Sequence, residues 1–328
     1  MLPLEVRIRR APETADDFEV REAEPPRLTG GAILCRARWL ALEPFVCAPR
    51  AGADRADSPH AAPRAGDVVP ALGVCEVVES RNDVFTVGQC VVVPCGLRQI
   101  FLSDGHDAAA LHPGQSPAWT ALGVLGPPGM AAYFGLLDLA GLRAGETVLV
   151  SAAAGIAGSV AGQVAALKGA RAVGIEGSRE RCDWVNRHAR LSTCIDHRSE
   201  RLNARLRQLA PEGFDIYFDS FGGELLETVL AGHHIARGGR VVLNCARAAD
   251  PESALRRGGY APGEVAILSL DRRSYEHRRA EFLKDAITWY GADRLVCHPD
   301  IVEGLRSAPA QLLRAMRGES FGQPLIKA

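Results

Sequence analysis

The segment 148–159, Val-Leu-Val-Ser-Ala-Ala-Ala-Gly-Ile-Ala-Gly-Ser, has residue types and a spacing that could bind a phosphate-bearing ligand. Apolar residues typical of a buried strand lead into a turn with Gly155 and Gly158 three residues apart, and an apolar helix is predicted to follow. Small residues let a pyrophosphate approach the backbone, and the helix N-terminus offers unpaired N–H groups. The residues predicted to bind the pyrophosphate of a dinucleotide are Gly155, Ile156, Ala157 and Gly158.

One feature weakens this pattern and another strengthens it. Ala153 stands at the first glycine position of G-x-G-x-x-G, so the bare motif is a weak indication of a dinucleotide site. The predicted strand before the turn and the predicted helix after it strengthen the indication, because dinucleotide-binding turns occur in that setting. The alternative is a helix of small residues that packs against a sheet and binds no ligand.

The end of the next predicted strand carries two conflicting signals about the dinucleotide. Glu176 lies 21 residues after Gly155, where an acid commonly accepts hydrogen bonds from the ribose 2′-hydroxyl of NAD. Arg179 and Arg181, with the hydroxyl of Ser178, could instead bind a 2′-phosphate through charge-assisted hydrogen bonds. Both arginines also fit solvated residues in the first turn of a helix. On these residues alone, NADP(H) and NAD(H) both remain open.

Alternating strands and helices are predicted to position this turn from about residue 124 onward. Such an array, mostly with intervals of roughly 20 to 30 residues between strands, is typical of a doubly wound parallel sheet. The predicted strands are 147–151, 171–176, 193–196, 215–219, 240–244 and 265–270. The predicted helices are 157–168, 179–189, 201–210, 224–235 and 274–290.

The residues before about 124 and the C-terminal tail are predicted to form a second kind of structure. Short apolar runs separated by Gly, Pro and Asp indicate strands at 31–40, 68–80 and 89–94, with an exposed loop at 48–66. The tail returns to short elements at 301–303, 309–316 and 324–327. We therefore expect an α/β protein with a β domain over 1–123, a dinucleotide-binding domain over 124–292 and a return to the β domain over 293–328.

The composition argues against several classes of protein. In 328 residues, 38 Lys and Arg nearly balance 39 Asp and Glu, so the basic excess typical of nucleic-acid-binding proteins is missing. The first ten residues do not read as a secretory signal, and nine irregularly spaced cysteines fit reduced thiols, so we expect a cytoplasmic protein. The uncharged stretch 147–167 starts with β-branched residues and has Gly and Ser at its centre, which favours a strand, a turn and a buried helix over a membrane span.

The residue spacings do not complete a metal-binding or hydrolase pattern. Cys90 and Cys95 lack the further cysteines of a structural zinc site, and the adjacent His233 and His234 would point about 100° apart on a helix. A Ser-His-Asp arrangement typical of a hydrolase is not recognised, and Gly158-Ser159 continues the predicted nucleotide turn. We therefore expect no metal.

Four segments together resemble one protein family. They are Gly126-Pro-Pro-Gly-Met-Ala-Ala-Tyr133, the glycine turn at 148–159, Phe214-Asp-Ile-Tyr-Phe-Asp-Ser-Phe-Gly-Gly223 and the tail 301–322. The combination resembles the medium-chain dehydrogenase/reductase superfamily, and within it the zinc-independent prostaglandin reductase and alkenal double-bond reductase branch. The resemblance covers essentially the whole chain. It implies a GroES-like β domain and a Rossmann domain, a homodimer, and a nicotinamide site between the two domains.

The reaction that the resemblance implies is hydride transfer from NADPH to the β-carbon of an α,β-unsaturated carbonyl compound, followed by protonation at the α-carbon. Such a site must orient the hydride donor and stabilise the developing enolate oxygen. The resemblance favours NADP(H) as cofactor. It implies that Asn244, Cys245 and Ser320 lie near the nicotinamide, and Trp39 and Phe45 are candidates for the substrate wall.

Departures from the branch pattern predict a pocket with fewer hydroxyl donors. They are Phe45 for tyrosine, Ala131 for threonine, Cys245 for glycine, Asp250 for tyrosine and Ser320 for asparagine. The catalytic proton donor is therefore unknown. Tyr260 and Tyr275 could supply a replacement phenol, although both also fit ordinary loop or helix-surface tyrosines.

We therefore expect an NAD(P)H-dependent oxidoreductase that reduces the activated C=C bond of a small molecule, for which an intermediate of specialised metabolism is considered. Two other hypotheses remain. The first is a cofactor-binding pseudoenzyme or sensor without redox turnover. The second is a tailoring enzyme on the same fold that catalyses another reaction, such as reductive cyclisation of the enolate.

Overall fold

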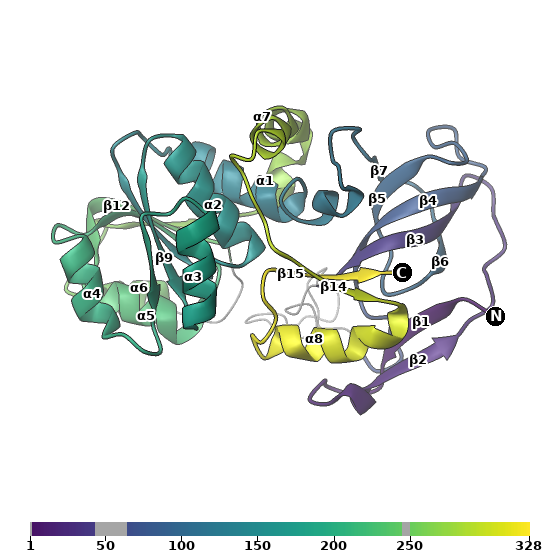
Figure 1. Cartoon of the computed structure of the whole chain (residues 1–328), viewed down its shortest axis with the longest axis horizontal. Coiled ribbons are helices and arrows are strands. Elements are labelled where there is room, and N and C mark those ends of the chain that lie inside the picture. The colour runs from purple at the N-terminus through teal and green to yellow at the C-terminus, as the bar shows by residue number, and fades with distance from the viewer. Residues whose placement is uncertain (1, 43–63, 245–249) are drawn as a thin grey trace. The chain divides into compact units, whose positions relative to one another are not determined.

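The computed structural model describes residues 2–42, 64–244 and 250–328, and it divides into two compact units (Figure 1). The first unit comprises Met1–Gly123 and Pro299–Ala328, and the second comprises Val124–His298. The chain returns to the first unit at Pro299 rather than at the expected residue 293. The side chain of Gln163 explains the difference, because it bonds both the N–H (2.7 Å) and the carbonyl (2.9 Å) of Val296 and so keeps this segment in the second unit.

The second unit is built on a six-stranded parallel sheet with the strand order β10-β9-β8-β11-β12-β13. This is the order 3-2-1-4-5-6 of a dinucleotide-binding Rossmann fold, so the predicted doubly wound α/β fold is confirmed. The strands are β8 (Thr147–Ser151), β9 (Arg171–Glu176), β10 (Thr193–Asp196), β11 (Phe214–Asp219), β12 (Ile235–Leu243) and β13 (Ala266–Ser269).

Helices cover both faces of this sheet (Figure 1). On one face, α4, α5 and α6 contribute Leu206, Leu226 and Leu255 to a core with the sheet residues Val173 and Tyr217. On the other face α2 packs against β8 and β9, and α3 packs against β9 and β10. The helices are α1 (Pro127–Phe134), α2 (Ile156–Leu167), α3 (Arg179–His188), α4 (Leu202–Leu209), α5 (Gly223–Ala231), α6 (Pro251–Arg257) and α7 (Arg279–Gly291), with the shorter turns η4 (Gly135–Leu139) and η5 (Arg272–Arg278).

The first unit is a β domain with a hairpin, β1–β2, and a seven-stranded sheet in the order β14-β15-β3-β4-β5-β7, to which β6 adds through β3. Its core includes Ile33, Val77 and Phe101 from the sheet and Leu312 from helix α8. The strands are β1 (Leu4–Ile8), β2 (Phe18–Glu22), β3 (Ile33–Ala41), β4 (Leu72–Ser80), β5 (Cys90–Pro94), β6 (Ile100–Ser103), β7 (Ala109–Ala110), β14 (Pro299–Glu303) and β15 (Gln323–Lys327). The helical elements are η1 (Ala15–Asp17), η3 (Ala118–Leu122), η6 (Leu305–Ser307) and α8 (Ala308–Met316).

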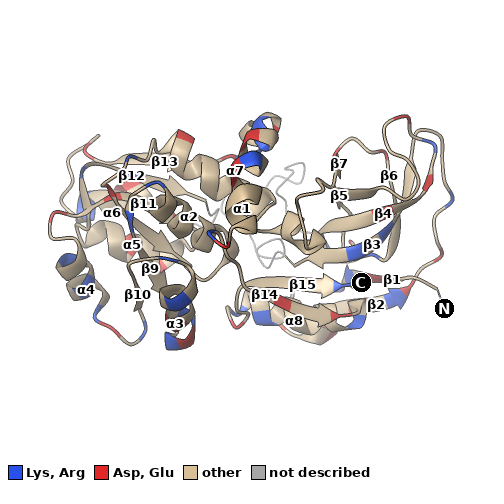
Figure 2. Ribbon diagram, turned by 45° about the horizontal axis from the view of Figure 1, so that its top comes forward, with Lys and Arg blue, Asp and Glu red and all other residues tan. Residues whose placement is uncertain are grey.

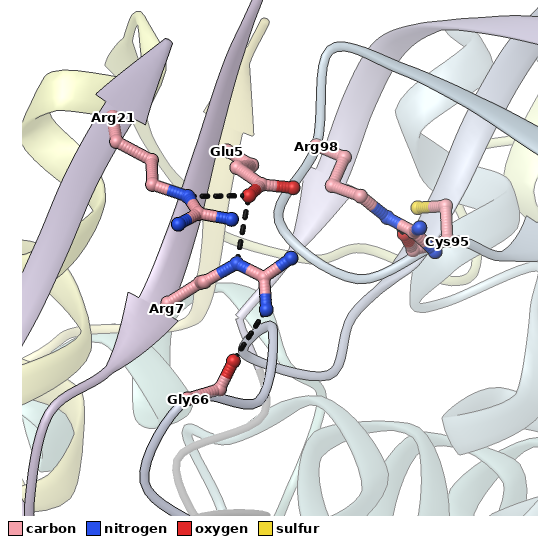
Figure 3. Close-up of polar contacts among 6 residues, drawn as sticks. All are labelled: Glu5, Arg7, Arg21, Gly66, Cys95 and Arg98. Atoms are coloured by element: carbon pink, nitrogen blue, oxygen red, sulfur yellow. Dashed lines mark hydrogen bonds and ion pairs between the residues drawn. The ribbon is translucent and has the colours of Figure 1, made fainter. Parts of the chain in front are cut away.

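A buried carboxylate ties the hairpin together (Figure 3). Glu5 on β1 is 6% exposed, and its Oε1 accepts hydrogen bonds of 2.7 Å from both Arg7 and Arg21. Arg7 in turn donates to the carbonyl of Gly66. Although burial alone raises the pKa of Glu5, the bonds from Arg7 and Arg21 leave that pKa below its ordinary value. The two arginines therefore keep the carboxyl ionised inside the domain.

Several predicted elements of the second unit have different bounds in the structure, among them α5 and β12. The predicted helix 224–235 was wrong at its C-terminal end, because α5 stops at Ala231 and is followed by Gly232 and by His233 in a left-handed conformation (φ 57°). Ile235 then starts β12, earlier than the predicted strand 240–244. Within residues 2–42, 64–244 and 250–328, no helix has both the length and the apolar character needed to cross a membrane.

Candidate functional site

The centre of the parallel sheet is the natural place for a ligand. The strand order reverses between β8 and β11, and open α/β sheets bind ligands beyond the carboxyl ends of the strands at such a point. Ser151, the last residue of β8, donates a 2.7 Å hydrogen bond to Oδ1 of Asp219, the last residue of β11. The N–H of Ser220 donates to Oγ of Ser151 (2.9 Å). These bonds fix the two strand ends from which the candidate site is built.

The predicted glycine turn lies directly beyond β8 and has the shape that a pyrophosphate requires. A Cβ at Gly158 would lie 2.2 Å from the carbonyl oxygen of Ala152, so only glycine lets α2 approach the turn this closely. Helix α2 begins after Gly155 and has no side-chain cap at its N-terminus. Figure 2 shows α2 without charged residues, so no carboxylate of this helix competes for its N-terminal N–H groups. The turn therefore fits a dinucleotide pyrophosphate.

The carboxylate of Glu176, at the end of β9, points inward beneath this turn. It is 6% exposed, its Oε1 accepts the N–H of Ala154 (2.7 Å), and its Oε2 accepts the N–H of Gly177 (3.2 Å). A guanidinium nitrogen of Arg181 lies 3.7 Å from Oε2. The structure thus brings together the turn, Glu176 and Arg181. Because its carboxylate is buried and turned toward backbone N–H groups, Glu176 is poorly placed to accept hydrogen bonds from a ribose.

The neighbouring residues of the predicted ribose site start helix α3. Ser178 is the N-cap of α3, and its Oγ accepts the N–H of Arg181 (3.4 Å). The side chain of Arg181 is 21% exposed, whereas Arg179 is exposed. Arg181 is therefore anchored close to the turn, while Arg179 lies out toward solvent.

Three residues that the sequence analysis did not select flank the same end of the sheet. A Cβ at Gly177 would lie 3.4 Å from both Nε of Arg198 and Nε2 of His197, which follow β10. The ring of His197 lies 6.4 Å from that of Phe221, an exposed aromatic that follows β11. Burial, with the charge of Arg198, lowers the pKa of His197. The signal for these residues was their position just after predicted strands, at the carboxyl edge where ligands bind.

The candidates for the nicotinamide and substrate region lie in different parts of the chain. Asn244 follows β12 at the carboxyl edge, where its N–H donates to the carbonyl of Asp219 (2.8 Å) and its side-chain amide donates to Oγ of Ser220 (3.0 Å). Ser320 and Trp39 belong to the first unit, Ser320 before β15 and Trp39 half-buried on β3. Cys245 and Phe45 lie outside the described residues. Asp250, expected at a tyrosine position, caps helix α6 by accepting the N–H of Ser253 (2.9 Å).

The two candidate proton donors have other contacts. The hydroxyl of Tyr260 accepts the N–H of Ile235 (2.7 Å) and donates to its carbonyl (2.8 Å), at the amino end of β12 and away from the carboxyl edge. The ring of Tyr275 stacks on Phe134 with centroids 4.7 Å apart. Burial and a hydrogen bond to Asp138 raise the pKa of Tyr275. Tyr260 therefore behaves as a core residue, and Tyr275 is held by Phe134 and Asp138.

A cavity of about 400 Å³ lies at the other end of α3, away from the turn. Its walls include Trp184 and His188 from α3 and Val296 from the segment after α7. Because α3 starts at the carboxyl edge of the sheet and ends here, this cavity is not part of the candidate dinucleotide site. Among the described residues, no group of three or more His, Cys, Asp or Glu side chains is placed to hold a metal ion.

Comparison with known proteins identifies the family. Residues 4–111 match the family "N-terminal domain of oxidoreductase", and residues 157–286 match the family "Zinc-binding dehydrogenase". Prostaglandin reductase 1 of Bos taurus is 32% identical over 325 residues, which cover 96% of this chain and 95% of that protein. The chain belongs to the prostaglandin reductase branch of the medium-chain dehydrogenase/reductase superfamily. The family predicted from the sequence is thus confirmed.

Other members of this branch are similar over the same length. The NADPH-dependent curcumin reductase of Escherichia coli K12 is 30% identical, with 95% of this chain and 92% of that protein aligned. The crystal structure of CurA from Vibrio vulnificus in complex with NADPH has a TM-score of 0.88 and 28% identity, and the match covers 99% of each chain. The protein is therefore an oxidoreductase of the medium-chain dehydrogenase/reductase fold.

Proposed function

We propose that this enzyme uses NADPH to reduce the C=C bond of α,β-unsaturated carbonyl compounds. One observation carries the proposal: the uncapped glycine turn lies at the β8/β11 switch point of a chain that is similar over its whole length to prostaglandin and curcumin reductases. When bound, the reduced nicotinamide supplies the hydride. The cofactor is NADP(H), as in the Escherichia coli relative and in the NADPH complex of the Vibrio structure.

Within this proposal the chain's own residues bind and orient the cofactor. Gly155, Ile156, Ala157 and Gly158 bind the pyrophosphate through the N-terminus of α2. Ser178 and Arg181 bind the 2′-phosphate, and the exposed Arg179 adds charge nearby. His197 and Phe221 provide ring surfaces for the adenine. Asn244, held by Ser220, is proposed to contact the nicotinamide, a role that the family resemblance also implies for Cys245 and Ser320. We assign Trp39 and Phe45 to the substrate wall.

The test is an assay of NADPH oxidation with a panel of 2-alkenals and enones, coupled to mass spectrometry of the product. A mass increase of two hydrogens supports reduction. Cofactor binding with no turnover on any panel member would indicate a pseudoenzyme or sensor. A product with an unchanged unsaturation count would indicate a tailoring reaction, which would suit an intermediate of specialised metabolism.

We further propose a cytoplasmic homodimer. β13 is an edge strand of the six-stranded sheet, and its Ile267 and Leu268 are only half-buried, so a second copy could pair along it. Seven described cysteines are free thiols, which suits a reducing compartment. Sedimentation equilibrium tests the assembly: a mass near that of one 35.0 kDa chain at micromolar concentration would contradict the dimer.

A further inference from the structure

Glu176 presents a physical problem for an enzyme that uses NADPH. A carboxylate beside the 2′-phosphate, which carries about −1.5 to −2 charges at neutral pH, repels it. An acid at this strand end is also the residue that commonly selects NAD through the ribose hydroxyls. The contacts of Glu176 in this protein show how the carboxylate is accommodated and what it does instead.

The first contact joins Glu176 to the pyrophosphate turn. Its Oε1 accepts the N–H of Ala154 at 2.7 Å, and both groups are buried. The residue before Ala154 in the turn, Ala153, is 0% exposed and donates its N–H to the carbonyl of Ile175 (3.3 Å), so strand β9 supports the turn at two points. The carboxylate therefore supports the part of the backbone that is proposed to approach the pyrophosphate.

The second set of contacts joins Glu176 to Gly177 and Arg181, which belong to the predicted ribose site. Its Oε2 accepts the N–H of Gly177 (3.2 Å) and lies 3.7 Å from the guanidinium of Arg181. The carboxylate is 6% exposed and the Arg181 side chain 21% exposed, so Arg181 is held between a buried negative charge and the solvent-facing ribose site. A phosphate that binds Arg181 from the open side must compete with the charge of Glu176.

We propose that Glu176 is a positioning residue that sets the strength of 2′-phosphate recognition. It holds Arg181 and the pyrophosphate turn in place, and its negative charge offsets part of the positive charge of Arg181. This inference rests on the proposed binding of the 2′-phosphate by Arg181. The carboxylate makes no contact with the ribose. Its charge lowers the preference for the phosphorylated cofactor, and its hydrogen bond to Ala154 supports binding of the pyrophosphate in either cofactor.

The variant Glu176→Gln separates the two roles, because the amide oxygen can still accept the N–H of Ala154 but the charge is gone. Adenosine 2′,5′-bisphosphate and 5′-AMP are the probes, titrated by calorimetry against the full-length protein. We expect about a tenfold tighter Kd for the bisphosphate and a change of less than twofold for 5′-AMP. Arg181→Gln should weaken the bisphosphate about tenfold and leave 5′-AMP unchanged.

The variant Glu176→Ala also removes the acceptor for Ala154, and we expect it to weaken NADPH and NADH alike, by about fivefold in fluorescence titrations. Glu212→Gln is the matched charge control. Glu212 is exposed and precedes β11 at the amino edge of the sheet, so its loss should leave the Kd values of all four ligands unchanged. Thermal unfolding of each variant establishes that the protein used in the titrations is folded.

Two results would overturn the inference. An unchanged ratio of bisphosphate to 5′-AMP affinity in Glu176→Gln would show that the charge does not reach the 2′-phosphate. Weaker binding of NADH alone in that variant would show that the carboxylate accepts hydrogen bonds from the ribose. Failure of the wild-type protein to bind either NADPH or NADH would instead contradict the proposed function, so the two failures are distinguishable.

Discussion

The hydroxyl of Ser151 lies 2.7 Å from Oδ1 of Asp219 and donates a hydrogen bond that joins the carboxyl ends of β8 and β11. Asp219 is 1% exposed and also accepts the hydroxyl of Tyr217 (2.8 Å) and the N–H of Gly222 (2.8 Å). Burial raises the pKa of Asp219, and these hydrogen bonds partly offset the effect. The two strand ends beside the candidate cofactor site are thus held through one buried acid.

Replacing Ser151 by alanine removes one donor from this buried acid. We expect Ser151→Ala to lower the free energy of unfolding by about 2 kcal/mol at pH 7, because a buried acceptor that loses a partner is costly. The folded-state pKa of Asp219 lies above its unfolded value, so the folded protein takes up the proton first as the pH falls. The loss of unfolding free energy caused by Ser151→Ala should therefore become smaller toward pH 4, because a protonated Asp219 depends less on the donor. Ser192→Ala is the control, because the hydroxyl of this exposed residue is bonded to a neutral carbonyl, and it should show a smaller cost that does not change with pH.

The glycine turn predicts unequal effects of two similar substitutions. In Gly158→Ala the new Cβ would lie 2.2 Å from the carbonyl oxygen of Ala152, and the backbone must move. We expect a loss of about 2 to 3 kcal/mol in urea unfolding, together with loss of NADPH binding. In Gly155→Ala the corresponding distance is 3.1 Å and φ is −74°, which alanine adopts readily, so the loss should stay below about 1 kcal/mol. Equal losses would contradict the observed packing of α2 on the turn.

The paired carboxylate of Glu5 should contribute stability that depends on pH. Glu5→Gln gives Arg7 and Arg21 a neutral amide oxygen in place of their shared carboxylate, and we expect a loss of about 2 kcal/mol at pH 7. The folded-state pKa of Glu5 lies below its ordinary value, so this stabilisation is present above about pH 4.5 and is lost as the pH falls through the folded pKa. Urea unfolding should show a smaller difference in free energy of unfolding between the wild-type protein and Glu5→Gln at pH 3 than at pH 7.

A matched control for Glu5 is the exposed ion pair between Glu303 and Lys327. Glu303→Gln should change the free energy of unfolding by less than about 0.5 kcal/mol, since solvent screens such pairs. A loss for Glu5→Gln that is as small as that of the control would mean that burial of the carboxylate adds nothing to the pair.

His234 should make the protein less stable in mild acid. It is 2% exposed, and burial, with the charges of Arg207 and His233, lowers its pKa to about 4. Between pH 6.5 and pH 4 the unfolded chain takes up a proton that the folded protein does not, so stability falls as the pH falls through this window. We expect His234 to account for about 3 kcal/mol of that fall.

The variant His234→Gln tests this, because its amide can still donate to the side chain of Asn203, the present partner of the ring. Thermal unfolding between pH 7 and pH 4 should have a flatter profile than that of the wild-type protein. The exposed His106→Gln serves as the control and should leave the profile unchanged. If the stability of His234→Gln depended on pH as steeply as that of the wild-type protein, other groups would be responsible for the sensitivity to acid.

The sequence predicted the buried strands well because their pattern is local. The strands 147–151, 171–176 and 193–196 are observed with the predicted bounds, since each is a mostly apolar run ended by turn residues. Asp250 followed by Pro251 is a start signal for α6 that could have been recognised, because Asp is a favoured N-cap and Pro fits the first helical position.

The orientation of Glu176 could not be predicted in the same way. At the end of the strand, Glu176 could accept hydrogen bonds from a ribose or point inward and support the turn. Its orientation depends on the N–H of Ala154, 22 residues away in the chain. The end of α5 likewise depends on a conformation, because Leu230 and Ala231 continue the helical pattern until His233 adopts positive φ. Local periodicity does not encode such contacts.

The position of β15 has a consequence for the order in which the protein is made. β15 lies between β14 and β3 inside the sheet of the first unit, yet the whole of the second unit separates it from β3 in the chain. During synthesis the second unit, Val124–His298, can fold while the Trp39–Ala41 end of β3 still lacks its partner on one edge. An unpaired edge of this kind is prone to aggregation. Nascent chains of this enzyme should therefore depend on chaperone protection until β15 has emerged from the ribosome.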